Sequence, residues 1–117
     1  MTQAPTPPLS KSRRAGDLLF LAGELPIGAD GAVPQGIEAQ THLTLDRIEA
    51  TLRAEGLGLA DIVSVTAYLV DAADFAAFNR AYASRLPVPY PVRTTVRADL
   101  MRAQALLELT VVAHARS

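Results

Sequence analysis

The stretch DIVSVTAYLVDAADFAAFNRAY, residues 61–82, decides the fold class because a strand pattern is followed directly by a helix pattern. Residues 61–70 are rich in β-branched side chains, which favour strands. A helix is predicted over about 71–86, where Asp71 can cap the first turn. Three aromatic side chains lie on one side of this helix: Phe75, Phe78 and Tyr82.

Two more strands are predicted on the C-terminal side of this stretch. The segment LPVPYP, residues 86–91, cannot continue the helix because its three prolines at alternate positions favour an extended path. The segments VRTTVRA (92–98) and ALLELTVVAHA (105–115) are typical of strands, and DLMRAQ joins them.

On the N-terminal side, the sequence predicts one strand and one helix. DLLFLAGELP, residues 17–26, is a short apolar run that ends in Gly and Pro, as a buried strand does. The segment 36–55 is the clearest helix, with one face formed by Ile37, Thr41, Leu45, Ile48 and Leu52. Residues 1–9 hold three of the eight prolines and are expected to form an extended arm.

The predicted order β, α, β, α, β, β indicates a two-layer α+β sandwich, with two helices over one sheet. If the N-terminal arm pairs as a strand, the order becomes β-β-α-β-α-β-β. With 117 residues and no internal repeat, the chain is expected to be a single domain over residues 1–117.

Strand alternation divides the predicted sheet into two unlike faces, because successive side chains point to opposite sides. One face is fully apolar and must be covered by the helices: Val63, Val65, Ala67, Leu69, Leu107, Leu109, Val111 and Ala113. We expect the other face to carry Ser64, Thr66, Tyr68, Arg93, Thr95, Arg97, Glu108 and Thr110.

Two interpretations of this mixed face remain open. It also holds Leu106 and Val112, so it is semi-polar, and a subunit interface with a polar cleft would suit it. Alternatively it is a solvent-facing sheet with cross-strand ion pairs, such as Arg97 with Glu108.

Composition excludes several classes of site. The chain has no cysteine, which rules out disulfides, thiolate metal sites and a cysteine nucleophile. His42 and His114 have no second ligand at metal spacing, so no metal is expected. A net charge of -1 and the absence of a basic stripe argue against a nucleic-acid partner. No apolar run reaches membrane-helix length, and the first residues lack a secretory pattern, so we expect a cytoplasmic protein with no membrane partner.

Four segments in order, LFLAGELP, FAAFNRAY, PVRTTV and ALLELTVVA, make the chain similar to the Rid (YjgF, reactive intermediate deaminase) family from about residue 9 to residue 115. The resemblance implies a chorismate-mutase-like fold and a homotrimer with clefts between its subunits. It also implies hydrolysis of 2-imino or enamino acids, of the 2-iminobutanoate/2-iminopropanoate kind, to 2-keto acids and ammonia. No cofactor is implied.

The resemblance also assigns roles to individual residues. It implies that Arg93 binds a substrate carboxylate and that Glu108 positions or activates the attacking water. Asn79 and Gly23 fall on further substrate-binding positions. This sequence departs from the family pattern at two positions, with Thr95 where a cysteine is common and Leu9 where a tyrosine is often found.

Two other functions remain open at this point. A non-catalytic protein could use the same cleft to bind a small carboxylate such as a keto acid. Some family members have been described as ribonucleases or translation inhibitors, but this chain has no aromatic stacking platform for nucleic acid.

Overall fold

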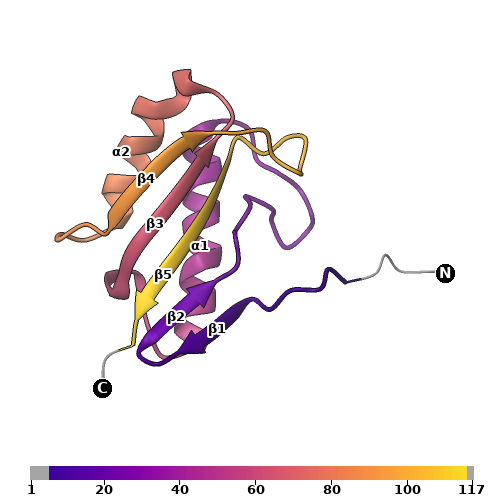
Figure 1. Ribbon diagram of the computed structural model, residues 1–117. Helices are drawn as coiled ribbons and strands as arrows, with labels where there is room; N and C mark the ends of the chain where they lie inside the picture. The colour runs from indigo at the N-terminus through magenta and orange to yellow at the C-terminus, as the bar shows by residue number, and fades with distance from the viewer. Residues whose placement is uncertain (1–5, 116–117) are drawn as a thin grey trace.

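The computed structural model describes residues 6–115, which form one sheet and two α-helices (Figure 1). The elements are β1 (Ser12–Ala15), β2 (Leu18–Leu21), α1 (Ile37–Ala54), β3 (Ile62–Leu69), α2 (Phe75–Arg85), β4 (Val92–Arg97) and β5 (Leu107–His114). Short 3-10 turns, Leu59–Asp61 and Ala72–Asp74, precede β3 and α2. The predicted two-layer α+β class is confirmed.

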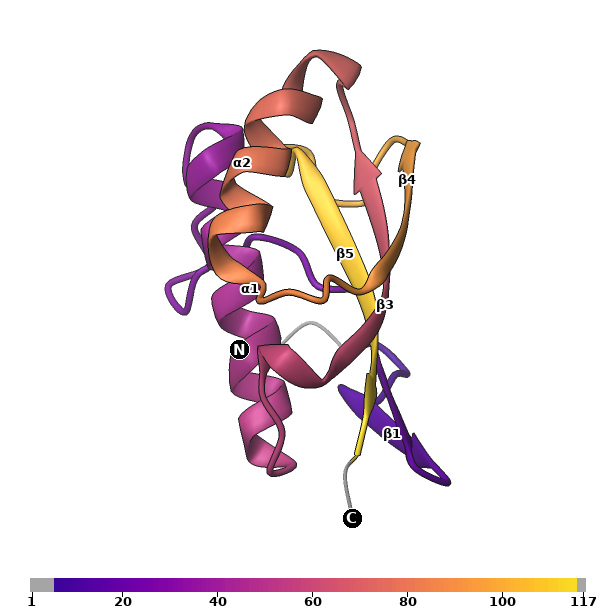
Figure 2. The ribbon, with the colours of Figure 1, turned by 90° about the vertical axis from the view of Figure 1, so that its left-hand side faces the viewer.

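The sheet has the strand order β1-β2-β5-β3-β4. Only β3 and β4 run parallel within the described sheet, and α2 makes the crossover between them. Figure 2 shows both helices on one side of the sheet, which leaves the other side open. No helix within residues 6–115 is both long enough and apolar enough to cross a membrane.

The first strand lies later in the sequence than the N-terminal arm, residues 1–9, that was expected to form it. β1 is Ser12–Ala15 and pairs with β2, so the seven-element order is correct, but the strand lies outside residues 1–9. Residues 1–5 lie outside the described part of the chain. In the rest of the arm, the Leu9 amide donates to the Pro7 carbonyl at 2.8 Å, which makes a tight turn rather than a fully extended path.

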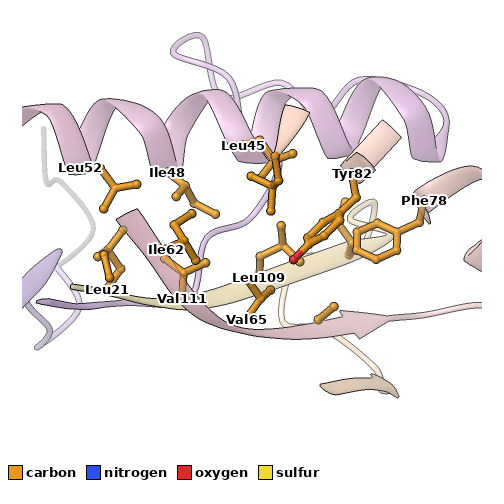
Figure 3. Close-up of a cluster of buried hydrophobic side chains, with 14 of the residues drawn as sticks. Leu21, Leu45, Ile48, Leu52, Ile62, Val65, Phe78, Tyr82, Leu109 and Val111 are labelled. Carbon is orange, nitrogen blue, oxygen red and sulfur yellow. The ribbon is translucent and has the colours of Figure 1, made fainter. Parts of the chain in front are cut away.

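The hydrophobic core lies between the helices and the covered face of the sheet (Figure 3). The predicted stripe on β5 is buried throughout: Leu107, Leu109, Val111 and Ala113. Leu45, Ile48 and Leu52 of α1 pack against it, as their spacing predicted. The covered face is therefore a conventional apolar core.

The prediction for the start of β3 is wrong. Val63 was assigned to the covered face but is 43% exposed, and Ile62 takes its place at 4% exposure. The ladder between β3 and β5 shifts register between Ile62 and Ser64. An extra residue in one strand reverses the alternation locally, so the simple period of two fails there.

Candidate functional site

Arg93 lies on the helix-covered side of the sheet, not on the open face where it was predicted. The parallel ladder places Arg93 beside Val65, which is fully in the core. Paired residues in a ladder point to the same face, so Arg93 and Thr95 point toward α2. Because β4 is the edge strand, the Arg93 side chain can reach α2 at the rim of the core.

The guanidinium of Arg93 is held by helix α2. Asp71 caps the 3-10 turn that leads into this helix by accepting from the Ala73 amide at 2.9 Å. Asn79 Oδ1 accepts a 2.7 Å hydrogen bond from Arg93 Nη2. Three ring centroids lie around Arg93 Cζ at 4.8, 5.2 and 5.7 Å, those of Tyr82, Phe78 and Phe75. Rings at these distances attract a cation and fix the plane of the guanidinium.

No carboxylate pairs with Arg93 anywhere in the described residues. Beside its guanidinium is an open hollow of about 270 Å³, lined by Asn79, Tyr82, Ala83, Tyr90, Pro91 and Arg93. The aromatic rings and the amide orient the cation without neutralising it. An arginine in this state can bind a small carboxylate through two parallel hydrogen bonds.

Glu108 belongs to a second group of residues, on the open face of the sheet. Its neighbour across the ladder is Tyr68 of β3. Gly23 lies directly against it: a Cβ atom at Gly23 would overlap Glu108 Oε2 and would lie 3.4 Å from Thr110 Oγ1. Burial raises the pKa of the Glu108 carboxyl, and the nearby carboxylate of Glu24 raises this pKa further.

Arg93 and Glu108 lie on opposite faces of the sheet, so the prediction that they share a face within one subunit is wrong. Strand β3 runs between their two strands, and the register offsets them along it. Ladder spacings put their Cα atoms roughly 14 Å apart. The alternative ion pair of Arg97 with Glu108 is wrong for the same reason, because Arg97 is paired with the buried Leu69.

The remaining predicted residues divide between the two groups. Thr95 lies two positions from Arg93 on the same side and lines a hollow of about 240 Å³ next to Phe75. Leu9 is exposed and lines a larger hollow of about 560 Å³ that reaches Ala22, the residue before Gly23. We call Arg93, Asn79 and Thr95 the arginine half-site, and Glu108, Gly23 and Leu9 the glutamate half-site.

The model of the Endoribonuclease L-PSP family matches residues 1–115. The chain belongs to this family. Since Rid (YjgF) proteins are members, the family resemblance read from the sequence is confirmed.

Curated and solved relatives agree with this membership. A RutC family protein of Pyrococcus horikoshii is 37% identical over 95% of this chain and 91% of its own. Reactive Intermediate Deaminase A of Arabidopsis thaliana is 32% identical over 91% of this chain and 58% of its own. The crystal structure of Escherichia coli TdcF with bound serine superposes with a TM-score of 0.86 at 27% identity, covering 97% of this chain and 91% of that one.

Within this L-PSP family chain, sequence reasoning missed the role of the aromatic residues around Arg93. The helical spacing placed Phe75, Phe78 and Tyr82 on one side of α2, but no local pattern indicated that an arginine of a strand would contact them. It also missed the ion pair of Glu24 with Arg47, whose members are 23 positions apart.

Metal ligands do not gather in the part of the chain that the structure describes. No group of three His, Cys, Asp or Glu side chains is placed to hold a metal ion within residues 6–115. The ring Nδ1 of His42 lies 3.2 Å from Arg85 Nη1, so this histidine is engaged with the helix surface.

Proposed function

We propose that this protein hydrolyses reactive 2-imino or enamino acids to 2-keto acids and ammonia, in clefts between the subunits of a homotrimer. Each cleft combines the arginine half-site of one subunit with the glutamate half-site of the next. The observation that carries the proposal is the Arg93 guanidinium, which is oriented by three rings and Asn79 but has no carboxylate partner among the described residues.

Carboxylate binding follows from the arginine half-site. A 2-imino acid carries its carboxylate next to the C=N carbon, so gripping the carboxylate also places the reacting atom. The planar fork of a guanidinium matches the two oxygens of a carboxylate.

Hydrolysis follows from the glutamate half-site. Glu108 takes a proton from a water as the water oxygen bonds to the C=N carbon, and it passes this proton to the nitrogen to give a carbinolamine. It then moves the hydroxyl proton of the carbinolamine to the nitrogen as the C–N bond breaks and the C=O bond forms. Water is consumed, and ammonia and the keto acid are released. A carboxyl whose pKa is raised by burial is a stronger base than an ordinary surface glutamate, which suits it to this role.

The open face of the sheet supports assembly. It exposes Phe20 and Val96 beside the polar residues, and Val92 is 71% exposed. A second copy of the chain covering this face would bury that apolar surface. It would also bring a foreign edge strand β4, with its arginine half-site, to the Glu108 face, where one subunit alone cannot put it.

The relatives support the chemistry at family level. Two of them carry the name reactive intermediate deaminase, and TdcF was crystallised with serine, an amino acid whose carboxylate is of the kind Arg93 can bind.

The decisive assay generates imines in situ with an amino-acid oxidase and follows ammonia or keto-acid release with and without this protein. Faster release for at least one imine, lost in Glu108→Gln, is the expected result. The rival function is a keto-acid binding protein, which Leu9 favours because it places no hydroxyl where relatives often have a tyrosine. Keto-acid binding with no acceleration for any imine would decide for that rival.

A further inference from the structure

A charged pair lies directly behind the glutamate half-site, and the proposed chemistry does not use it. Arg47 Nε of helix α1 is 2.6 Å from Glu24 Oε1, and Arg47 Nη1 also donates to the Ile27 carbonyl. The Glu24 side chain is only 12% exposed. The Arg47 side chain is 30% exposed and both residues line an open hollow, so solvent screens the pair in part and its contribution to stability is modest. Its position next to Gly23 is what calls for a reason.

The backbone of Glu24 fastens the glutamate half-site together. Its amide donates to the Leu109 carbonyl at 2.8 Å, and the Leu109 amide donates back to the Glu24 carbonyl at 3.1 Å. Glu24 follows Gly23, and Leu109 follows Glu108. These two bonds therefore hold Gly23 against the Glu108 side chain, at a contact too close for any Cβ atom.

The side chain of Glu24 takes the opposite direction from Glu108. It shares the covered side of the sheet with Leu109 and meets Arg47 there, so its negative charge lies behind the strand that carries Glu108. Across the described ladder from Glu108, Tyr68 of β3 also carries a group that can titrate. Thr110 is uncharged, and Arg93 is on the far face.

We propose that Glu24, anchored by Arg47, is a positioning residue for Glu108. Its backbone sets Gly23 against the carboxyl, and its partly neutralised charge adjusts how readily Glu108 takes up a proton. This inference rests on the proposed function for its consequence in catalysis, but it makes a statement about Glu108 that holds without any substrate.

Two substitutions should shift the pKa of Glu108 in opposite directions. Glu24→Gln removes a like charge and leaves the Arg47 cation behind, so the pKa of Glu108 should fall and the acidic limb of the pH–rate profile should move to lower pH. Arg47→Gln leaves the Glu24 charge without its counter-ion, so the pKa of Glu108 should rise and the limb should move to higher pH. Glu49→Gln is the matched control, since it removes a charge from the same helix where Glu49 pairs with Arg53.

The measurement is the titration of the Glu108 carboxyl by carbon NMR on glutamate-labelled protein, with the pH–rate profile recorded in parallel. The inference is supported if the pKa of Glu108 moves in opposite directions in Glu24→Gln and Arg47→Gln and does not move in Glu49→Gln. Displacements of the same sign, or no displacement, overturn it. If no imine is hydrolysed, the proposed function fails while the titration still decides the inference.

If Glu24→Gln fails to fold, two variants of Arg47 provide a second comparison. Arg47→Lys keeps the positive charge but cannot reproduce both arginine bonds. Because the charge is kept, the pKa of Glu108 in Arg47→Lys should lie near the wild-type value, whereas in Arg47→Gln it should not. Equal behaviour of these two Arg47 variants would mean that the pair serves packing only, and it would overturn the inference.

Discussion

Arg93 donates a 2.7 Å hydrogen bond to Asn79, and this bond ties the edge strand β4 to the middle of helix α2. Two of the rings that contact Arg93 are close to Asn79 in the sequence: Phe78 directly precedes it, and Tyr82 follows three positions later. A single helix therefore supplies both the polar and the aromatic contacts that orient the guanidinium.

Removing this guanidinium should weaken the binding of small carboxylates. We expect Arg93→Ala to weaken binding of small keto acids by about 2–5 kcal/mol, the usual cost of losing one partner of a buried charge pair. Arg93→Lys should not rescue binding, because an ammonium cannot form the two-pronged contact. Isothermal titration calorimetry measures this. Arg80→Ala, on the exposed side of the same helix, is the control and should bind normally.

Mixing two inactive variants should restore activity if the cleft is shared between subunits. Arg93→Ala and Glu108→Gln homotrimers should each be inactive. After unfolding and refolding together in equal amounts, about a quarter of wild-type activity should return, since most random trimers are mixed and each mixed trimer has one intact junction. Light scattering should give a trimer mass. A monomer mass, or no recovery on mixing, would contradict the shared cleft.

Gly23→Ala should damage catalysis more than folding. The added Cβ would meet Glu108 Oε2, so the carboxylate must swing out of position. We expect a large loss of imine hydrolysis, within the roughly 10²–10⁴-fold range of general acid–base help, with the trimer intact. Gly58→Ala is matched to it, because no atom of the described residues lies within 4 Å of a Cβ there. Equal activity of the two variants would argue against the role of Glu108.

The effect of Glu108→Gln on stability should depend on pH. The folded-state pKa of Glu108 is raised, so its ionised form disfavours folding above that pKa, and this penalty disappears as pH falls below the unfolded value. The glutamine variant should therefore be more stable than wild type near pH 7 and equal to it in acid. Urea unfolding at several pH values tests this, and a variant less stable at neutral pH would contradict it.

Tyr82→Phe should stabilise the protein. The Tyr82 hydroxyl is buried with no hydrogen-bond partner among residues 6–115, and Figure 3 shows it pointing into the core toward Leu109. Burial also raises the pKa of this phenol, although Arg93 opposes the shift. The ring that contacts Arg93 is kept, so keto-acid binding should persist. Removing an unpaired buried hydroxyl gains about 1 kcal/mol or more. Tyr90→Phe, at an exposed position, is the control in the same unfolding experiment.

The local patterns in the sequence predicted the elements well. Helix α1 and the apolar stripe of β5 follow from periodicity, and the cap at Asp71 follows from its position before the aromatic run. The chain's membership of the family was also visible in four short segments. The cytoplasmic location and the absence of a nucleic-acid partner stay predictions.

The face on which Arg93 lies could not be predicted from its own strand. Alternation correctly separated Arg93 and Thr95 from Val92 and Val96, but only the pairing of Arg93 with Val65 fixes which set faces the helices. That register depends on a crossover through α2 and is not local. The irregularity at Ile62 shows the same limit, because an inserted residue leaves no signal in the pattern.

The placement of Arg93 and Glu108 on opposite faces has a genetic consequence in the proposed trimer. Each subunit serves two clefts, one with each face, so a subunit that lacks both residues disables both of its clefts and leaves one of the trimer's three intact. A cell that makes equal amounts of normal and doubly altered chains would keep about a quarter of its activity, because both subunits at a cleft must be normal. Such an allele would behave as dominant, whereas a chain that simply fails to fold would be recessive.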